Sequence, residues 1–154
     1  MWDALFAFTN VWALLAWVLL LVFPRNALTH SAIMYLGVGL LCFIYLVIFA
    51  LVLGGVVDPM RAAGSANPSF SSIAGIRGFF GSDGGVVIGW THYLAFDLFT
   101  GLWISRDADA KQFARLAQVP FLVLTFLAGP IGLFLWLAVR ERAARRLARA
   151  QKAA

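Results

Sequence analysis

Three side chains that can carry protons lie close together in one apolar stretch. His92, Tyr93 and Asp97 fall within GWTHYLAFDLFTGLWISRD, which runs from residue 89 to residue 107. An ionised carboxylate at the centre of a bilayer costs roughly 2.5–3.5 kcal/mol on insertion scales. Ionisable residues at that depth usually handle protons or bind ligands, so we interpret Asp97 as a candidate acid or base. The alternative is structural: a hydrogen-bonded carboxyl that ties helices together.

Helical spacing divides this stretch into two polar faces. At about 100° per residue, one face collects Trp90, Tyr93, Asp97, Thr100 and Gly101. His92 projects about 140° away from Asp97, on the side of Phe96. Because polar groups occupy both faces, we expect this helix at the centre of the protein. For His92, a position at the membrane interface is an equally open interpretation.

The composition predicts that lipid surrounds this helix. Of the 154 residues, 62% are hydrophobic and 12% are charged, whereas soluble domains are about 45–50% apolar and about a quarter charged. Four stretches reach the roughly 20 residues that cross a bilayer: residues 4–23, 31–57, 84–105 and 113–139. We therefore predict an all-α fold, an integral membrane four-helix bundle over residues 1–140, followed by a basic tail over 141–154.

Basic residues predict the orientation of the bundle. Six of them follow the last apolar stretch: Arg140, Arg142, Arg145, Arg146, Arg149 and Lys152. With four crossings, Arg61 and Arg77 join them, which places eight basic residues on one side against four on the other. This bias predicts that both termini are cytoplasmic. We expect the tail to contact anionic membrane lipids and no nucleic acid.

The first apolar stretch lacks the features of a cleaved signal peptide. No Lys or Arg precedes it, and it is longer than a typical signal core. We expect a retained anchor in a multi-pass protein of the bacterial inner membrane. Cys42 is the sole cysteine and cannot form an intramolecular disulfide. With two separate histidines, His30 and His92, no metal site is expected.

Two further segments have local signals. Within the long loop over residues 58–83, Ser71 or Ser72 is a candidate cap for a short helix. That helix would lie at the interface or fold over the mouth of the bundle, and the pattern does not choose between them. Residues 129–132 read Gly-Pro-Ile-Gly, which predicts a kink at Pro130. The glycines there allow close helix packing or leave room for a ligand.

These motifs together resemble the abscisic-acid-deficiency four-like family. The resemblance lies in GWTHYLAFDLF over residues 89–99, in the Gly-Pro-x-Gly of residues 129–132, and in the opening FTNVWALLAWVLLLVFPRN with Asn10 and Pro24. Members are small four-span membrane proteins, and the plant members are needed to make neoxanthin from violaxanthin. The likeness extends over nearly the whole chain up to Arg140.

The resemblance implies isomerisation of a carotenoid or another isoprenoid lipid without a cofactor. Opening a 5,6-epoxide to an allenic alcohol needs an acid at the epoxide oxygen and a base at the polyene chain. Asp97 and His92 are the implied pair, with Tyr93 as a further donor, and Asp97→Asn is expected to abolish conversion. The substrate-binding candidates are Trp90, Asn10, Trp12, Phe96, Thr100, Gly101, Gly129 and Pro130.

Two other classes of function stay open at this point. One is a non-enzymatic accessory subunit that binds pigment or lipid within a membrane complex, either with a partner chain or as a homo-oligomer. The other is a small proton-coupled carrier, which Asp97 alone would suggest. Four crossings without an internal repeat make the carrier the least favoured of the three.

Overall fold

The described part of the chain is built from helices. A computed structural model describes residues 1–23, 26–57 and 67–153, leaving out the side chains of residue 143 and of residues 146–153. The elements are α1 (Trp2–Val22), α2 (Ala27–Ala32), the π-helix η1 (Ile33–Gly39), α3 (Leu40–Leu53), α4 (Ile73–Phe79), α5 (Asp83–Ala110) and α6 (Arg115–Ala153).

By length and composition alone, three helical segments could cross a membrane. They are Trp2–Val22, Ala27–Leu53 (which joins α2, η1 and α3) and Arg115–Arg142. The chain is therefore a membrane protein. Helix α5, which holds the predicted crossing at residues 84–105, does not meet the same criterion, because polar residues such as His92 and Asp97 interrupt its apolar run.

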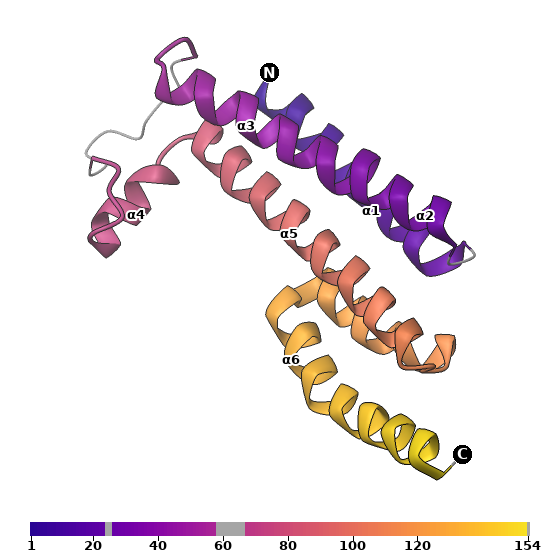
Figure 1. Ribbon diagram of the computed structural model, residues 1–154. Helices are drawn as coiled ribbons and strands as arrows, with labels where there is room; N and C mark the ends of the chain where they lie inside the picture. Colours follow the sequence, from indigo (N-terminus) through magenta and orange to yellow (C-terminus); the bar gives the residue numbers. More distant parts are fainter. Residues whose placement is uncertain (24–25, 58–66, 154) are drawn as a thin grey trace.

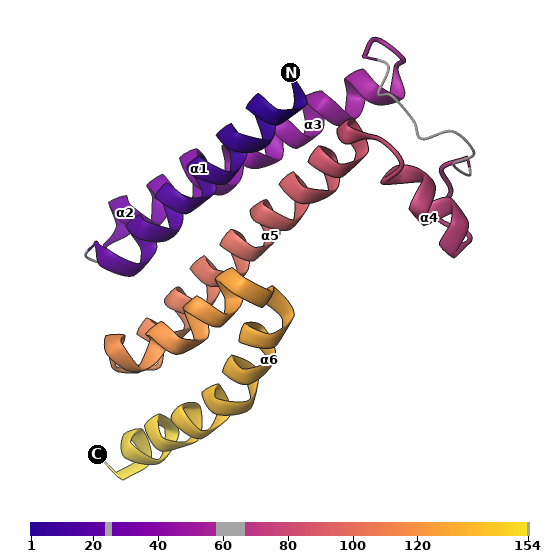
Figure 2. The same cartoon turned by 180° about the vertical axis from the view of Figure 1, so that it is seen from behind.

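Helix α5 lies at the centre of the fold. Helices α1, α3 and α6 and the η1 segment all pack against it, as the two views in Figures 1 and 2 show. The expected central position of the helix with two polar faces is thus confirmed. The core beside it is apolar, with Trp17, Leu41 and Leu98 buried.

Small residues set how closely the helices approach α5. A Cβ atom at Gly101 would collide with the ring of Trp17 in α1. At Gly37 in η1, a Cβ atom would lie 3.1 Å from Leu98 Cδ2 and 3.2 Å from Ala16 Cβ. The sequence therefore places glycines where α1, η1 and α5 meet most closely.

The second membrane segment contains the π-helix. Asn26 caps the start of α2, the first helix of this segment, by accepting a hydrogen bond from the Thr29 backbone N–H at 2.8 Å. The Leu36 carbonyl accepts a hydrogen bond from Trp12 Nε1 of α1 at 2.7 Å. This bond joins the π-helical part of the second segment to α1.

Helix α4 is the short helix expected in the long loop. Ser72 caps it, with its hydroxyl accepting from the Gly75 N–H at 3.0 Å, so the cap prediction is confirmed. The helix lies at the end of the molecule where α3 ends and α5 begins (Figure 1). The remainder of the predicted loop, residues 58–66, lies outside the described residues.

Helix α6 reverses direction instead of crossing straight. Ala128 leaves the helical region at φ −157° and ψ 75°, and Pro130 follows two residues later. The rings of Phe121 and Trp136 are 5.5 Å apart, although 15 residues of straight helix would separate them by about 22 Å. The kink predicted at Pro130 is confirmed, but it is sharp enough to make two antiparallel limbs (Figures 1 and 2). Residues 113–139 thus form no single straight helix.

Candidate functional site

An apolar cavity of about 390 Å³ lies between α3, α4 and the beginning of α5. Its volume is within the range of about 300–1,000 Å³ that is usual for ligand sites. Aromatic and aliphatic side chains make up most of its wall. They include Tyr45, Phe49, Val52, Phe70, Ile76, Phe79, Phe80 and Ile88.

His92 supplies a titratable group to this wall. Its ring centroid is 5.6 Å from that of Tyr45 in α3 and 4.6 Å from that of Phe96, one turn further along α5. Tyr45 also stacks on Phe49 at 5.6 Å. The cavity therefore combines an imidazole and a phenol with an apolar surface. His92 is exposed and Tyr45 is half-buried, so both are open to a ligand.

Sequence reasoning missed Tyr45. It lies in the middle of a stretch without charges, where the hydroxyl is the one available signal. Its approach to His92 comes from the antiparallel pairing of α3 with α5. The cavity is therefore a product of tertiary structure.

Glycines in α5 allow α4 to close over the cavity. A Cβ atom at Gly89 would collide with the Phe80 ring, and one at Gly85 would collide with the Phe79 carbonyl. Helix α4 lines one side of the cavity, and its placement at the membrane interface or over the mouth of the bundle stays a prediction. Phe79 and Phe80 then face the same hollow as His92.

Asp97 lies on another face of α5. Only 9% of its surface is exposed, and its carboxyl packs directly against Gly129 of α6. A Cβ atom at residue 129 would overlap that carboxyl. The Gly129 backbone interacts with the carboxyl, whereas Asp97 Oδ2 has no hydrogen-bond partner among the described residues.

A polar chain continues from Asp97 towards α1. The Tyr93 hydroxyl interacts with the carboxyl and lies 3.4 Å from the Leu127 carbonyl oxygen, to which it donates. The Tyr93 ring stacks on Trp90 at 5.3 Å. Trp90 Nε1 donates to Asn10 Oδ1 at 3.0 Å, so the network joins three helices. Five of the predicted residues thus come together: Asn10, Trp90, Tyr93, Asp97 and Gly129.

The structure therefore does not bring His92 and Asp97 together. His92 faces α3 and the cavity, whereas Asp97 faces the turn of α6. Asp97 does not line the cavity between α3, α4 and α5. Their catalytic roles stay predictions.

Most of the other predicted binding residues have structural contacts outside the cavity. Thr100 donates to the Phe96 carbonyl of its own helix at 2.8 Å. Gly101 packs against the Trp17 ring, and Pro130 belongs to the turn of α6. Trp12 lines a second, open cavity of about 310 Å³ between α1 and η1.

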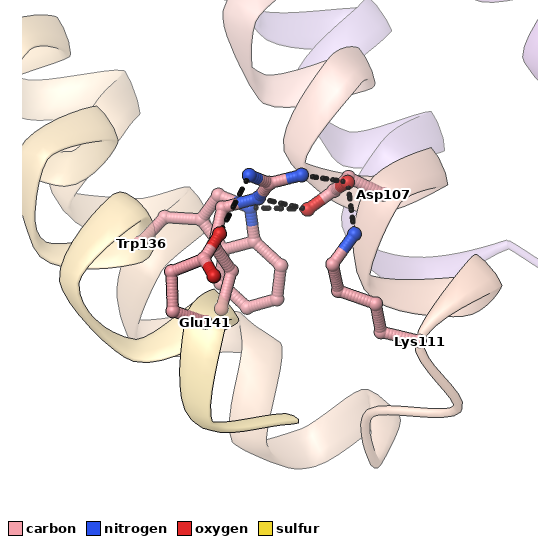
Figure 3. Close-up of polar contacts among 5 residues, drawn as sticks. Asp107, Lys111, Trp136 and Glu141 are labelled. Atoms are coloured by element: carbon pink, nitrogen blue, oxygen red, sulfur yellow. Dashed lines mark hydrogen bonds and ion pairs between the residues drawn. The ribbon is translucent and has the colours of Figure 1, made fainter. Parts of the chain in front are cut away.

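A charged cluster holds the other end of α5. Asp107 accepts two bonds of 2.8 Å from Arg140, one of 2.6 Å from Lys111 Nζ and one of 3.0 Å from Trp136 Nε1 (Figure 3). The Arg140 guanidinium is the main reason why the pKa of Asp107 lies well below its usual value. Lys111 and Trp136 lower that pKa further, against the effect of burial. Sequence reasoning assigned Arg140 to the tail and missed this role. The Asp107–Lys111 spacing of four residues was its one local sign.

No group of three or more potential metal-ligating His, Cys, Asp or Glu side chains occurs among the described residues.

Fold and cavity together define a small α-helical membrane protein with an aromatic, mostly apolar pocket beside a histidine. The chain belongs to the ABA DEFICIENT 4-like family, whose model matches residues 4–136. Comparison with curated proteins and with solved structures gives no match. The family assignment confirms the resemblance drawn from the motifs at residues 89–99 and 129–132.

Proposed function

We propose that this protein binds a ring-bearing isoprenoid lipid of the carotenoid type and isomerises its epoxide end group. The observation that carries the proposal is the cavity of about 390 Å³, in which aromatic side chains surround His92 and Tyr45. Aromatic and aliphatic walls suit one cyclic end of a hydrocarbon, while the polar pair would meet the oxygen on that ring. The remainder of the polyene would extend into the lipid.

The chemistry requires two proton movements. One proton goes to the epoxide oxygen as its C–O bond breaks, and one proton leaves the adjoining polyene carbon as the allene forms. The composition of the lipid does not change, so no oxidant or reductant is consumed. An imidazole and a phenol on one wall can serve as base and acid for such a step. We therefore place the chemistry at His92 and Tyr45, and we assign Asp97 to the turn of α6.

The test uses the purified protein in mild detergent with violaxanthin as the probe. We expect a product with the altered visible spectrum and retention time of the allenic isomer. His92→Ala should reduce conversion by a factor of 100 or more, in the range of about 10²–10⁴ for loss of a general acid or base. Tyr45→Phe should retain binding and lose conversion.

Asp97→Asn is the variant that separates the two placements of the chemistry. It is nearly isosteric and keeps the side chain at the turn of α6, so we expect most of the conversion to remain. Lost conversion in a folded Asp97→Asn protein, with His92→Ala active, would return the chemistry to Asp97. Bound but unchanged violaxanthin in the unmodified protein would favour the pigment-binding accessory subunit.

Filling the cavity tests its occupancy without touching the polar pair. Ile88→Trp adds bulk to the wall from α5 and should weaken carotenoid binding at least tenfold. Ile131→Trp is the matched control, because Ile131 is exposed on α6 outside the cavity. Equal binding by both variants would contradict the assignment of this cavity.

A further inference from the structure

The break at Ala128 divides α6 into two limbs that pack against each other. The first runs from Arg115 to the break at Ala128 and the second continues from there. Trp136 of the second limb lies with its ring 5.3 Å from Phe113 and 5.5 Å from Phe121. The first limb has about 13 residues, or about 20 Å of helix, which is less than the roughly 30 Å of hydrocarbon in a bilayer. It can reach the middle of a membrane but cannot cross it.

The turn between the limbs is supplied with polar partners. Broken helical backbone within a bilayer must be buried in protein, because each unsatisfied backbone group in hydrocarbon costs several kcal/mol. Here the Leu127 carbonyl accepts from Tyr93, and the Gly129 backbone interacts with Asp97. Gly129 itself is buried. The Asp97 carboxyl of α5 therefore packs against the backbone at the start of the second limb.

An ion pair joins the second limb to α5 at the end of the hairpin opposite its turn. Arg140 of the second limb and Lys111 beside the first limb both bind Asp107 (Figure 3). In addition, the Arg140 guanidinium lies 5.5 Å from the centroid of the Trp103 ring. The first limb thus begins at the C-terminal end of α5, and the second limb returns to that end at Arg140.

We propose that α6 is a re-entrant helical hairpin, which enters and leaves the membrane on the same face. The crossings are then α1, the α2–η1–α3 segment and α5. Because this number is odd, the N-terminus and the C-terminal limb lie on opposite sides of the membrane. This arrangement replaces the expected four crossings with both termini on one side.

The distribution of charge agrees with the hairpin. Among the basic side chains that the structure describes, six lie towards the C-terminal end of α5: Arg106, Lys111, Arg115, Arg140, Arg142 and Arg145. Arg77 in α4 lies at the other end. Six against one is a stronger bias than the four against three that four crossings would give for the same seven side chains. By the positive-inside rule, the C-terminal limb is cytoplasmic and the N-terminus is not.

The hairpin also locates the cavity, and this step rests on the proposed function. The cavity lies beside α4 and the beginning of α5, whereas Arg140 binds Asp107 near the other end of α5. A membrane-dissolved lipid would therefore reach His92 from the leaflet opposite the basic limb. The tests of the membrane orientation below do not depend on whether the protein converts violaxanthin.

Cysteine labelling tests the topology in the full-length chain. In a Cys42→Ala background, Asp3→Cys, Ser71→Cys, Ala114→Cys and Arg142→Cys introduce single thiols at exposed positions. Expressed in a bacterial host, Asp3→Cys and Ser71→Cys should react with a membrane-impermeant maleimide added to intact spheroplasts. Ala114→Cys and Arg142→Cys should react only after the membrane is opened. Labelling of residues 3 and 142 from the same side would overturn the proposal.

A distance measurement checks the hairpin without reference to sides. Spin labels at residues 114 and 142 would be about 42 Å apart if α6 crossed as one straight helix. In the hairpin both positions lie near the Asp107 cluster, so pulsed electron resonance should give a much shorter distance. A distribution centred near 40 Å would rule out the hairpin, whatever the enzyme activity of the sample.

Discussion

The polar residues of α5 have divided roles, and their division follows from the faces they occupy. His92 points to an open aromatic hollow, while Asp97 is sealed against a glycine. A buried carboxyl is costly unless neighbouring donors satisfy it. Asp97 lies directly against the backbone break of α6, which would itself be costly if it were exposed to lipid.

Gly129→Ala should destabilise the protein by about 1–3 kcal/mol, because the added methyl overlaps the Asp97 carboxyl. The melting temperature in detergent is the measurement. The same substitution should cost less in an Asp97→Ala background, where the overlap is gone. Equal costs in the two backgrounds would show that the contact does not matter.

A matched control for this pair is Gly39→Ala. Its new methyl would meet only the Met34 carbonyl oxygen, at 3.4 Å, and residue 39 is exposed. Since alanine favours helix over glycine by up to about 1 kcal/mol, we expect an unchanged or slightly raised melting temperature.

At the scale of the element, the reversal of α6 is the main structural feature. Ala128 and Pro130 break the helix, and Gly132 packs so closely on Thr125 that a Cβ atom would collide with it. The break allows a change of direction, but contacts at the far ends of the limbs decide how large that change is. Trp136 supplies them by packing on Phe113 and Phe121, and Arg140 adds an ion pair with Asp107 of α5.

Asp107→Asn should lower stability at neutral pH by about 1–3 kcal/mol, since it removes charge-assisted bonds at a partly exposed site. The pKa of Asp107 is lower in the folded protein than in the unfolded chain, so its contribution is complete above the unfolded value of about 3.9 and is lost as the pH falls further. The melting temperatures of the two proteins should therefore differ most above about pH 5 and converge below about pH 4.

Asp3→Asn serves as the reference for this pH series, because Asp3 is exposed in the first turn of α1. It should shift the melting temperature far less than Asp107→Asn above about pH 5, where the contribution of Asp107 is complete. A constant difference between wild type and Asp107→Asn down to pH 3 would argue against the charged cluster as the source of stability.

At the scale of the whole molecule, α5 is the element on which the others are assembled. Helix α1 reaches it through Trp17 and Gly101, the η1 segment through Gly37, and α6 through Gly129. Close approach through small residues is the usual basis of helix association in membranes, where apolar surfaces gain little by leaving lipid.

Gly101→Leu should separate α1 from α5, because the new side chain takes the space of the Trp17 ring. We expect a loss of at least about 1–3 kcal/mol together with a change in tryptophan fluorescence as Trp17 is displaced. Gly39→Leu, at an exposed position, is the control of equal added volume. Similar melting temperatures for the two variants would contradict the central role of the Gly101 contact.

The sequence by itself determined the properties that depend on local composition. Apolar runs of sufficient length identify a helical membrane protein, and Ser72 and Pro130 mark a helix cap and a helix break through the chemistry of their own side chains. The two polar faces of α5 follow from the helical repeat alone, and they correctly imply a central position. Family membership was likewise evident from the motifs.

Only the tertiary structure decided which neighbours those residues meet. Helical spacing shows that His92 and Asp97 diverge, but not that Tyr45 lies against one and Gly129 against the other. A proline predicts a kink without its angle, which here depends on Asp107 and Arg140, 33 positions apart. Contacts between distant positions leave no local pattern in the sequence, because they arise when separate helices pack.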